Sequence, residues 1–368
     1  MKILITTGVY PPELGGPATY TKMLETHLPK YGFEVSVLPF STVRHLPKVI
    51  RHIAYFWKCL LLGRDVDSIF AQDPMSVGFP SLLAAKLLGK PFYLRLGGDY
   101  AWEQGRLRFG VRVSLETFAC AGGRFHWVVR VFQRVQSCVA CSAMRIAVQS
   151  AFMKKIVACW GVPEEKITVI PNGCDGGTVM PDRQKEREAL NLRGTIGVSA
   201  GRLVPWKGFA ELIEIVPDIL MRIPDFVLYI IGDGPERERL HNLVAEKGLV
   251  GRVRFTGRLD KKALIRYLAS ADVFILNTEY EGFSNQLLEV YSVGTPIVTT
   301  DIGGNQGVVG DGISGLLVPV HDRKALKDAV LTVIGNKVLA QKLVSGGREK
   351  LREFSIERVA AATADFLS

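Results

Sequence analysis

The sequence PNGCDGGTVMPDRQKEREAL, residues 171–190, separates two halves of this 368-residue chain. It is polar and rich in Pro and Gly, which is typical of a linker between folded segments. On either side of it, short apolar runs alternate with longer amphipathic segments, and the chain is longer than a single core usually supports. The stretch therefore predicts two domains, residues 1–180 and 181–351, followed by a segment, 352–368, whose helix packs back on the first domain.

Each half contains six apolar runs of strand length. They are residues 2–6, 34–38, 68–71, 92–96, 145–148 and 167–170 in the first half, and 196–200, 227–231, 253–256, 273–276, 296–299 and 315–318 in the second. Strands that alternate with helices predict parallel sheets, so we expect an α/β fold of two doubly wound, Rossmann-like domains. Ligands bind at the carboxyl ends of such strands, which makes a cleft between the domains the expected site.

Basic residues gather in the first half of the chain. Residues 1–160 hold 20 Lys and Arg against 9 Asp and Glu, whereas residues 161–368 hold 26 against 27. Segments 50–62 (IRHIAYFWKCLLL) and 124–134 (RFHWVVRVFQR) interleave cations with large apolar residues, as interfacial membrane helices do. They favour contact with an anionic membrane surface over two core-facing helices with basic edges. No recognised binding motif accompanies the charge, so nucleic acid is not an expected partner.

The start of the chain suggests the cytosol, a reducing compartment in which cysteines stay free. Residues 1–8 lack the features of a signal peptide, and no apolar run approaches the roughly 18 residues of a membrane span. We therefore expect a cytoplasmic protein, peripheral on the inner face of the plasma membrane where its basic helices bind lipid. The six cysteines fall mainly in apolar surroundings, which predicts free core thiols. Cys138 and Cys141 form a lone CxxC without the second pair of a zinc site.

Two glycine-containing turns follow predicted strands. The first contains Gly15 and Gly16 before a helix that opens with Pro17, an arrangement whose amides suit an oxyanion, although many such turns hold no ligand. The second begins at Gly201 and carries Arg202 and Lys207. Arg grips phosphate with two parallel hydrogen bonds and Lys supplies a mobile charge, so we expect this pair to neutralise a diphosphate; the alternative is two surface cations on a loop.

The stretch EGFSNQLLE, residues 281–289, has a carboxylate at each end of an expected helix start. A helix beginning near Phe283 directs the amides of Phe283, Ser284 and Asn285 at an incoming anion. Glu289 then lies about 9 Å further along the helix. This spacing fits a nucleotide-diphosphate sugar with Glu281 at the sugar and Glu289 at the ribose hydroxyls. The alternative for Glu289 is a partly buried helix acid.

Together these pieces resemble the GT4-type retaining glycosyltransferases, glycosyltransferase group 1, of the GT-B fold. The matching pieces, in the family's order along almost the whole chain, are Gly15-Gly16, PNG at 171–173, Gly201-Arg202 with Lys207-Gly208, IGDGP at 231–235, and the E-x7-E from Glu281 to Glu289. The resemblance implies transfer of a sugar from a nucleotide donor with retention at the anomeric carbon, with no cofactor and no obligatory metal.

The family pattern also assigns roles to individual residues. It implies that Arg202 and Lys207 bind the diphosphate, Glu289 binds the ribose, and the turn Gly282, Phe283, Ser284 and Asn285 binds the phosphates and sugar. Glu281 is implied at the sugar and the reaction centre. Departure of a nucleoside diphosphate builds negative charge, which fixed cations and amides stabilise.

Other positions match the family pattern less closely. Arg258 and Leu259 are similar to the family's nucleobase-contacting turn. Many relatives carry a His after the fourth strand of the first domain, but the corresponding loop here has none, and Asp99 is the nearest substitute as a polar contact to the donor sugar or acceptor. Tyr100 and Trp102 are expected on the acceptor side. Asp65-Val-Asp67 imitates a metal-binding DxD motif, but both acids are typical turn residues.

The acceptor implied is a hydroxyl of a lipid-linked or polysaccharide intermediate in envelope glycan synthesis. Three other functions remain open: a nucleotide-sugar epimerase of the same fold, a dinucleotide oxidoreductase, and a non-catalytic basic adaptor for membranes or nucleic acid. The oxidoreductase is disfavoured because no G-x-G-x-x-G follows the first strand. Product analysis with and without an acceptor separates transferase from epimerase.

Overall fold

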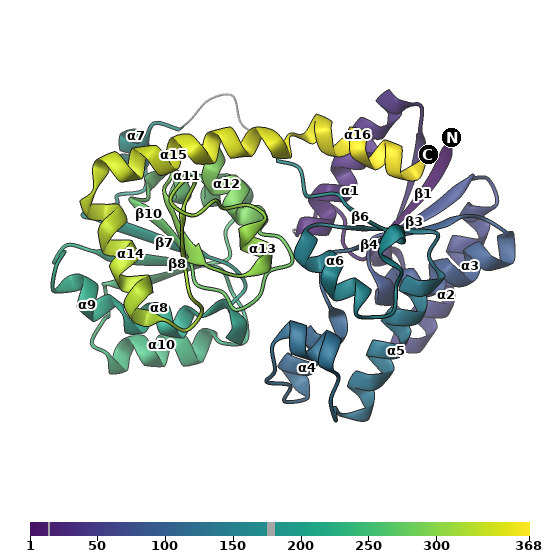
Figure 1. The fold of residues 1–368 in the computed structure, drawn as a ribbon, viewed down its shortest axis with the longest axis horizontal. Coiled ribbons are helices and arrows are strands. Elements are labelled where there is room, and N and C mark those ends of the chain that lie inside the picture. Colours follow the sequence, from purple (N-terminus) through teal and green to yellow (C-terminus); the bar gives the residue numbers. More distant parts are fainter. Residues whose placement is uncertain (14, 175–180) are drawn as a thin grey trace. The chain divides into compact units, whose positions relative to one another are not determined.

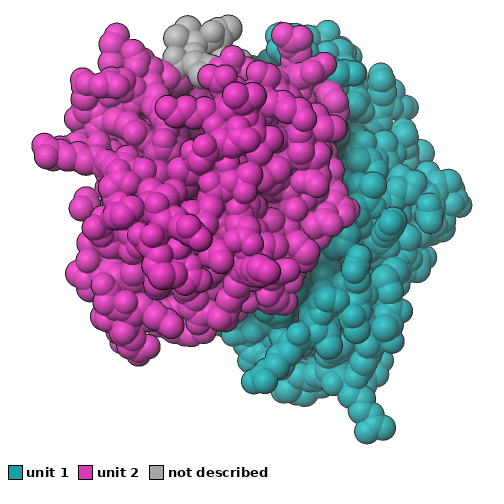
Figure 2. Space-filling view, turned by 60° about the vertical axis from the view of Figure 1, so that its left-hand side comes forward, with its two compact units in different colours: residues 1–173, 356–368 teal, residues 174–355 magenta. Residues whose placement is uncertain are grey.

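The structure, a computed structural model, describes residues 1–13, 15–174 and 181–368. The chain forms two compact units, one of residues 1–173 and 356–368 and the other of residues 174–355 (Figure 2). The domain boundary expected at residue 180 lies outside the described residues.

The first unit is built on a six-stranded parallel sheet with strand order β2-β1-β3-β4-β5-β6. Its strands are β1 Lys2–Thr7, β2 Glu34–Pro39, β3 Ser68–Ala71, β4 Phe92–Leu96, β5 Arg145–Val148 and β6 Ile167–Val169. Its α-helices are α1 Gly16–His27, α2 Lys48–Gly63, α3 Phe79–Leu88, α4 Tyr100–Arg108, α5 Trp127–Ser142, α6 Ala151–Ala158 and α16 Ile356–Leu367 (Figure 1). All six predicted strands are present.

The second unit repeats this architecture with strand order β12-β11-β10-β7-β8-β9, again all parallel. Its strands are β7 Ile196–Ala200, β8 Val227–Ile231, β9 Val253–Gly257, β10 Val273–Leu276, β11 Ile297–Thr300 and β12 Leu316–Val318. Its α-helices are α7 Arg183–Ala189, α8 Phe209–Glu214, α9 Val216–Leu220, α10 Arg237–Glu246, α11 Lys261–Ser270, α12 Asn285–Val293, α13 Gly303–Gln306, α14 Arg323–Gly335 and α15 Lys337–Leu351. The predicted pair of doubly wound domains is confirmed.

The strands of the second unit are apolar on both faces because each face meets a separate core. Tyr229 and Ile231 pack into a cluster with residues of α12, whereas the alternate residues Leu228 and Ile230 pack into a cluster with residues of α8 and α14. Successive side chains of a strand point to opposite faces, so a strand covered on both sides is a continuous apolar run. The apolar runs in the sequence are therefore explained by burial on both sides.

The C-terminal helix α16 belongs to the first unit. It lies beside α1 (Figure 1), and the hydroxyls of Tyr20 and Thr363 are 3.0 Å apart in the buried contact between the two helices. Val359, Phe366 and Leu367 lie in the same core as Ile3 and Ile5 of β1. The last helix thus completes one face of the first sheet.

The cysteines differ from the expectation of free core thiols. Cys120 and Cys159 form a disulfide with a Cα–Cα distance of 5.0 Å, and Cys138 and Cys141 are exposed. Only Cys59 is a buried free thiol among the described residues. The expectation was wrong because apolar neighbours in sequence do not determine which cysteines meet in the fold.

Candidate functional site

The loops after β7 and β8 interlock at the carboxyl edge of the second sheet. The amide of Gly201 donates to the carbonyl of Ile231 at 2.9 Å, and the amide of Leu203 donates to the carbonyl of Asp233 at 3.1 Å. A Cβ atom added at Gly232 would lie 1.9 Å from the Gly201 oxygen. Glycine is required there because no side chain fits between the two loops. The glycines of the IGDGP segment thus position the loop that carries Arg202 and Lys207.

The loop after β10 packs against the same region from the other side. Asn277 Nδ2 donates to the Gly208 carbonyl at 3.1 Å, and the amide of Glu279 donates to the Trp206 carbonyl at 2.8 Å. A Cβ atom at Gly208, which has a φ of 59°, would lie 2.1 Å from the Asn277 oxygen. The loops after the adjacent strands β7 and β10 are therefore held together.

This packing brings two of the predicted residues together. Lys207 Nζ forms an ion pair with Glu281 Oε1, and both side chains are largely buried. A partly desolvated ion pair fixes both side chains, because separating them would leave a charge poorly solvated. A cation and a carboxylate are therefore held side by side at the end of β10.

Helix α12 begins four residues after Glu281, two residues later than predicted. The helix begins at Asn285 with Ser284 as its N-cap residue, so Phe283 and Ser284 precede it. Glu289 is four residues from the helix start, which is about 6 Å along the axis rather than 9 Å. Ser284 Oγ is buried and has no hydrogen-bond partner among the described residues. An unsatisfied hydroxyl beside helix-terminal amides is suited to an anionic ligand.

Glu289 is a largely buried acid on α12. Burial raises the pKa of its carboxyl, and the charge of Lys261 at the start of α11 partly offsets the rise. A carboxylate held in this way loses solvation without a full ion pair. It fits a ribose diol, whose hydroxyls supply the missing hydrogen bonds, as well as the alternative of a partly buried helix acid.

Two further predicted positions follow strands of the same sheet. Arg202, after β7, and Arg258, after β9, are exposed, and Leu259 packs partly against the core that includes α12. Since the strands are parallel, Arg202, Arg258 and Glu281 all lie at the carboxyl edge. Among the described residues, no hydrogen bond or ion pair joins either arginine to the Lys207–Glu281 pair, so the roles of Arg202 and Arg258 stay predictions.

In the first unit, Gly15 and Gly16 form the predicted helix start. Gly15 is the N-cap residue of α1 with a φ of 156°, Gly16 is the first helical residue, and a proline occupies the first turn. This conformation is consistent with the interpretation that the turn leaves backbone amides open to an anion. Whether it binds the donor stays a prediction.

Asp99 is the N-cap residue of α4. Its Oδ1 accepts hydrogen bonds from the Trp102 amide at 2.9 Å and from Gln136 Nε2 at 3.0 Å. The side chain has no exposed surface, and burial raises the pKa of its carboxyl although these hydrogen bonds oppose the rise. Its Oδ2 is buried and has no hydrogen-bond partner among the described residues. In this structure Asp99 holds α4, and its expected contact with the sugar or acceptor stays a prediction.

The two predicted acceptor-side aromatics differ in exposure. Trp102 is 1% exposed and its Nε1 donates to the Val113 carbonyl at 3.0 Å, so its expected contact with an acceptor is corrected to a core position. Tyr100 is half-buried, and its ring packs edge-on against Phe132 with the centroids 5.3 Å apart. Tyr100 alone retains surface for an acceptor.

Other residues of the first unit have local structural roles. Asp67 Oδ2 accepts a hydrogen bond from the Lys2 amide at 2.7 Å at the start of β1, which agrees with the interpretation of Asp65 and Asp67 as turn residues. No group of three or more His, Cys, Asp or Glu side chains that could hold a metal ion occurs within the described parts of the chain.

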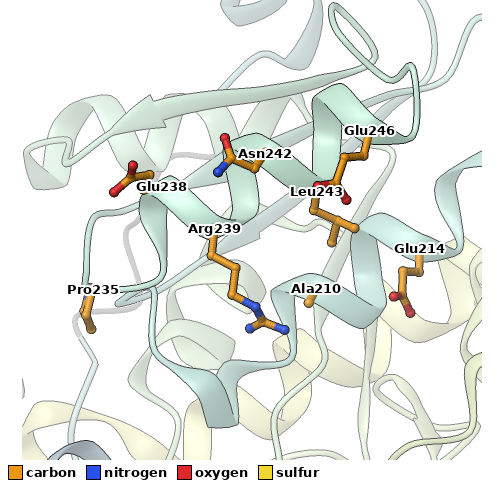
Figure 3. A pocket seen from close by; sticks show the side chains of 8 residues that line it. All are labelled: Ala210, Glu214, Pro235, Glu238, Arg239, Asn242, Leu243 and Glu246. Atoms are coloured by element: carbon orange, nitrogen blue, oxygen red, sulfur yellow. The ribbon is translucent and has the colours of Figure 1, made fainter.

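A groove of about 540 Å³ lies between α8 and α10 (Figure 3). It is lined by Ala210, Glu214, Pro235, Glu238, Arg239, Asn242, Leu243 and Glu246. Arg239 reaches from α10 into the space beside α8, but three glutamates share the lining (Figure 3). Its carboxylates oppose a diphosphate, and the groove contains none of the predicted site residues.

Two residues that shape the site were not predicted. Asn277 holds the β7 and β10 loops together, and Gly304 allows the loop after β11 to approach Glu281. A Cβ atom at Gly304 would lie 1.8 Å from the Glu281 oxygen. The available signals were an Asn directly after the strand 273–276 and a Gly-Gly pair soon after the strand 296–299.

Comparison with known families matches both halves of the chain. Residues 181–350 match the model described as glycosyl transferases group 1, and residues 26–173 match the glycosyl transferase 4-like domain.

Among the described residues, the structure contains no helix with the length and apolar character that a membrane span requires.

Curated relatives have related names. A lipopolysaccharide core biosynthesis glycosyltransferase, LpsE of Rhizobium meliloti, is 35% identical over 207 residues, 56% of this chain and 58% of the relative. A D-inositol 3-phosphate glycosyltransferase of Nocardioides is 32% identical over 62% of this chain and 54% of its own. The chain thus spans little more than half the length of these two relatives. A glycogen synthase of Mycobacterium tuberculosis is 27% identical over 99% of this chain and 94% of its own.

Solved structures share the fold along the whole chain. HepE of Anabaena, solved in complex with UDP, has a TM-score of 0.77 at 20% identity and is covered to 99%, with 100% of this chain aligned. Sucrose-phosphate synthase from Thermosynechococcus elongatus has a TM-score of 0.81 at 20% identity, with 100% of this chain and 98% of that chain aligned. At these identities the likeness shows the two-domain fold.

Proposed function

We propose that this chain, which belongs to the group 1 glycosyltransferase family of the GT-B fold, is a retaining glycosyltransferase. It moves a sugar from a nucleotide-diphosphate donor to a hydroxyl acceptor. The observation that carries the proposal is the Lys207–Glu281 ion pair beside the start of α12. It places a held cation, a carboxylate and helix-terminal amides along one edge of a sheet.

Different groups of the site bind different parts of the donor, beginning with the diphosphate. Breaking the bond from the anomeric carbon to the phosphate oxygen leaves its electron pair, and a growing negative charge, on the diphosphate. Lys207, Arg202, the α12 amides and the unpartnered Ser284 hydroxyl are the donors that stabilise this charge. With positive charge supplied by the chain, the reaction has no obligatory metal.

The positions of the other site residues along the sheet edge assign them to the sugar, the ribose and the nucleobase of the donor. Glu281, held by Lys207, accepts hydrogen bonds from the sugar, and Glu289 accepts them from the ribose hydroxyls. Arg258 and Leu259 adjoin the nucleobase. UDP and UDP-glucose, which are bound in the HepE structures, are the first donors to test.

The acceptor proposed is a lipid-linked or polysaccharide intermediate in envelope glycan synthesis. This is supported by the name of the Rhizobium relative and by the cationic excess of the first 160 residues. The same excess supports a cytoplasmic protein that is peripheral on the inner face of the plasma membrane. Nucleic acid is not among the proposed partners.

A nucleotide-sugar screen followed by product analysis tests the proposal. A donor that binds the folded state raises the melting temperature by mass action. With that donor and an acceptor, in the presence of EDTA, we expect a glycoside whose anomeric configuration, measured by proton NMR coupling, equals that of the donor. Glu281→Gln is expected to lower kcat/KM at least about a hundredfold, by the scale of lost transition-state stabilisation.

Each part of the proposed function would be contradicted by a different result. Conversion of the donor sugar without an acceptor would indicate the epimerase, and an inverted product would overturn retention. Full activity of Glu281→Gln would remove this carboxylate from the mechanism. Strict dependence of the rate on added Mn²⁺ would overturn the metal-independent chemistry.

A further inference from the structure

Three helices of the first unit expose large apolar side chains along their outer sides. On α2, Ile50, Ile53, Trp57 and Leu61 recur at helical spacing and are all more than half exposed, while Tyr55 and Cys59 of the same helix are fully buried. Such a helix uses one side for the core and presents a second apolar side to the surroundings. Isolated exposed apolar residues need no explanation, but a continuous row does.

The helices that pack beside α2 and α3 also expose apolar side chains. On α3, Phe79, Leu83 and Leu87 are exposed at intervals of four residues, and on α5 Trp127 and Val131 are exposed. Helix α3 packs against both α2 and α5 (Figure 1). We call the exposed apolar residues of these three packed helices, α2, α3 and α5, the three-helix face. The contribution of α3 to it was not apparent from the sequence.

The charged residues of α2, α3 and α5 are all basic. Helices α2, α3 and α5 contain six Lys or Arg residues and no Asp or Glu. The cations are Lys48, Arg51, Lys58, Lys86, Arg130 and Arg134. Two of the large apolar side chains are tryptophans, Trp57 at 55% and Trp127 at 70% exposure. Tryptophan is enriched where an apolar medium meets water.

Exposed apolar side chains together with an excess of basic residues favour one class of partner. A second copy of this chain would bring cations against cations, which costs binding energy. Nucleic acid complements the charge but not rows of exposed Ile and Leu. An anionic bilayer complements both, because its phosphates attract Lys and Arg and its acyl boundary receives the apolar side chains.

We propose that the three-helix face docks the first unit on an anionic phospholipid bilayer, with Trp57 and Trp127 inserted at the level of the acyl boundary. The inference rests on the proposed membrane location of the enzyme and names the surface that produces it. It concerns the first unit alone, whereas the donor residues of the proposed function lie in the second unit.

Vesicle binding tests the proposal on the full chain. We expect cosedimentation with vesicles of equal parts phosphatidylcholine and phosphatidylglycerol, and weak binding to phosphatidylcholine alone. Lys58→Glu with Arg130→Glu should lower the partition coefficient at least about tenfold, since each basic residue contributes appreciably near an anionic surface. Arg222→Glu with Lys247→Glu, which makes the same change of charge at two exposed positions of the second unit, is the matched control and should bind as the wild type.

Fluorescence gives a second measurement that does not depend on charge-reversed variants. Of the five tryptophans, Trp102 and Trp206 are buried. Lipids brominated on their acyl chains should quench the wild-type emission, and Trp57→Phe with Trp127→Phe should abolish most of the quenching while leaving vesicle binding within about threefold. These conservative changes preserve apolar surface.

The outcomes distinguish this inference from the proposed function. Equal binding of wild type and the charge-reversed variant, or no quenching by brominated lipid, would overturn the docking face. So would a wild-type dimer that these substitutions dissociate, since it would identify a second copy as the occupant. A melting-temperature shift by the selected donor that is the same in wild type and variants shows that the donor site is intact in either case.

Discussion

Glu289 combines an unfavourable environment with a proposed role in binding. Burial raises the pKa of its carboxyl, and Lys261 offsets only part of the rise. A raised folded-state pKa means that the contribution of this group to stability is present below the ordinary glutamate value and is lost as pH rises through the folded pKa. At neutral pH the ionised carboxylate therefore destabilises the ligand-free protein.

We predict that Glu289→Gln stabilises the ligand-free protein and weakens donor binding. The gain in melting temperature over wild type should be larger at about pH 7.5 than at about pH 5, because only the wild type titrates. The shift caused by the selected nucleotide should fall at the same time, since Gln accepts fewer hydrogen bonds from a diol. Glu246→Gln, at an exposed position, is the control. A lower melting temperature for Glu289→Gln at the higher pH would contradict this.

Gly304 controls the position of Glu281. Its added Cβ atom would lie 1.8 Å from the Glu281 carbonyl, so Gly304→Ala must displace the loop that carries the ion pair. We predict a loss of kcat/KM of about tenfold or more, by the cost of misplacing a reacting group. Gly335→Ala, where the added Cβ meets nothing within 4 Å, should keep wild-type activity. Equal activities of the two variants would show that the close approach has no catalytic consequence.

At the residue scale, the sequence predicted which loops meet better than which side chains are exposed. The conjunction of Lys207 and Glu281 followed from strand ends, since neighbouring parallel strands place their loops at one edge. Trp102 and Asp99 were placed at the site because of their side-chain types, yet both are buried. Their hydrogen-bond partners Val113 and Gln136 lie 11 and 37 residues away, so the local sequence does not indicate these contacts.

At the level of elements, the strands were predicted to within about one residue at most ends, because burial on both faces leaves an uninterrupted apolar run. The start of α12 was less predictable. Ser284 has an extended backbone with a ψ of 100°, which delays the helix to Asn285. Helix ends are the least regular part of such predictions, and the sequence alone did not indicate this one.

Asp99 and the short helix α4 provide a test at this scale. We predict that Asp99→Ala lowers the free energy of unfolding by about 2 kcal/mol, because it removes the helix cap and leaves the amide of Gln136 buried without a partner. Asp260→Ala, which removes a comparable cap of α11 at an exposed position, should cost about 1 kcal/mol. Urea unfolding monitored by circular dichroism compares the two, and an equal loss would mean that Gln136 adds nothing.

At the scale of the whole molecule, the last helix stabilises a sheet that the chain began more than 300 residues earlier. Phe366 is 1% exposed, and its ring lies 6.0 Å from that of Phe70 and 5.6 Å from that of Tyr93. The amphipathic pattern of segment 356–367 indicated a helix, which we expected to pack back on the first domain, but the pattern did not indicate which residues of that unit it contacts. Neither did the cysteine positions indicate which pair would meet.

We predict that Phe366→Ala destabilises the first unit by about 3–5 kcal/mol, the usual effect of deleting a buried aromatic side chain. Thermal unfolding followed by near-ultraviolet circular dichroism measures the loss. The shift of the second unit's transition by the selected nucleotide should persist, because α16 belongs to the first unit. Unchanged unfolding of Phe366→Ala would contradict the assignment of α16 to that core.

The most direct test of the central claim is calorimetric titration of the nucleoside diphosphate of the selected donor into wild type, Lys207→Ala and Lys247→Ala. Lys207 forms the ion pair with Glu281, whereas Lys247 is exposed at the end of α10. We predict that Lys207→Ala weakens binding at least about tenfold and that Lys247→Ala binds as the wild type, since a charge-assisted phosphate contact is worth about 1.5–3 kcal/mol. Equal affinity of Lys207→Ala and wild type would contradict the claim that this edge of the second sheet holds the diphosphate.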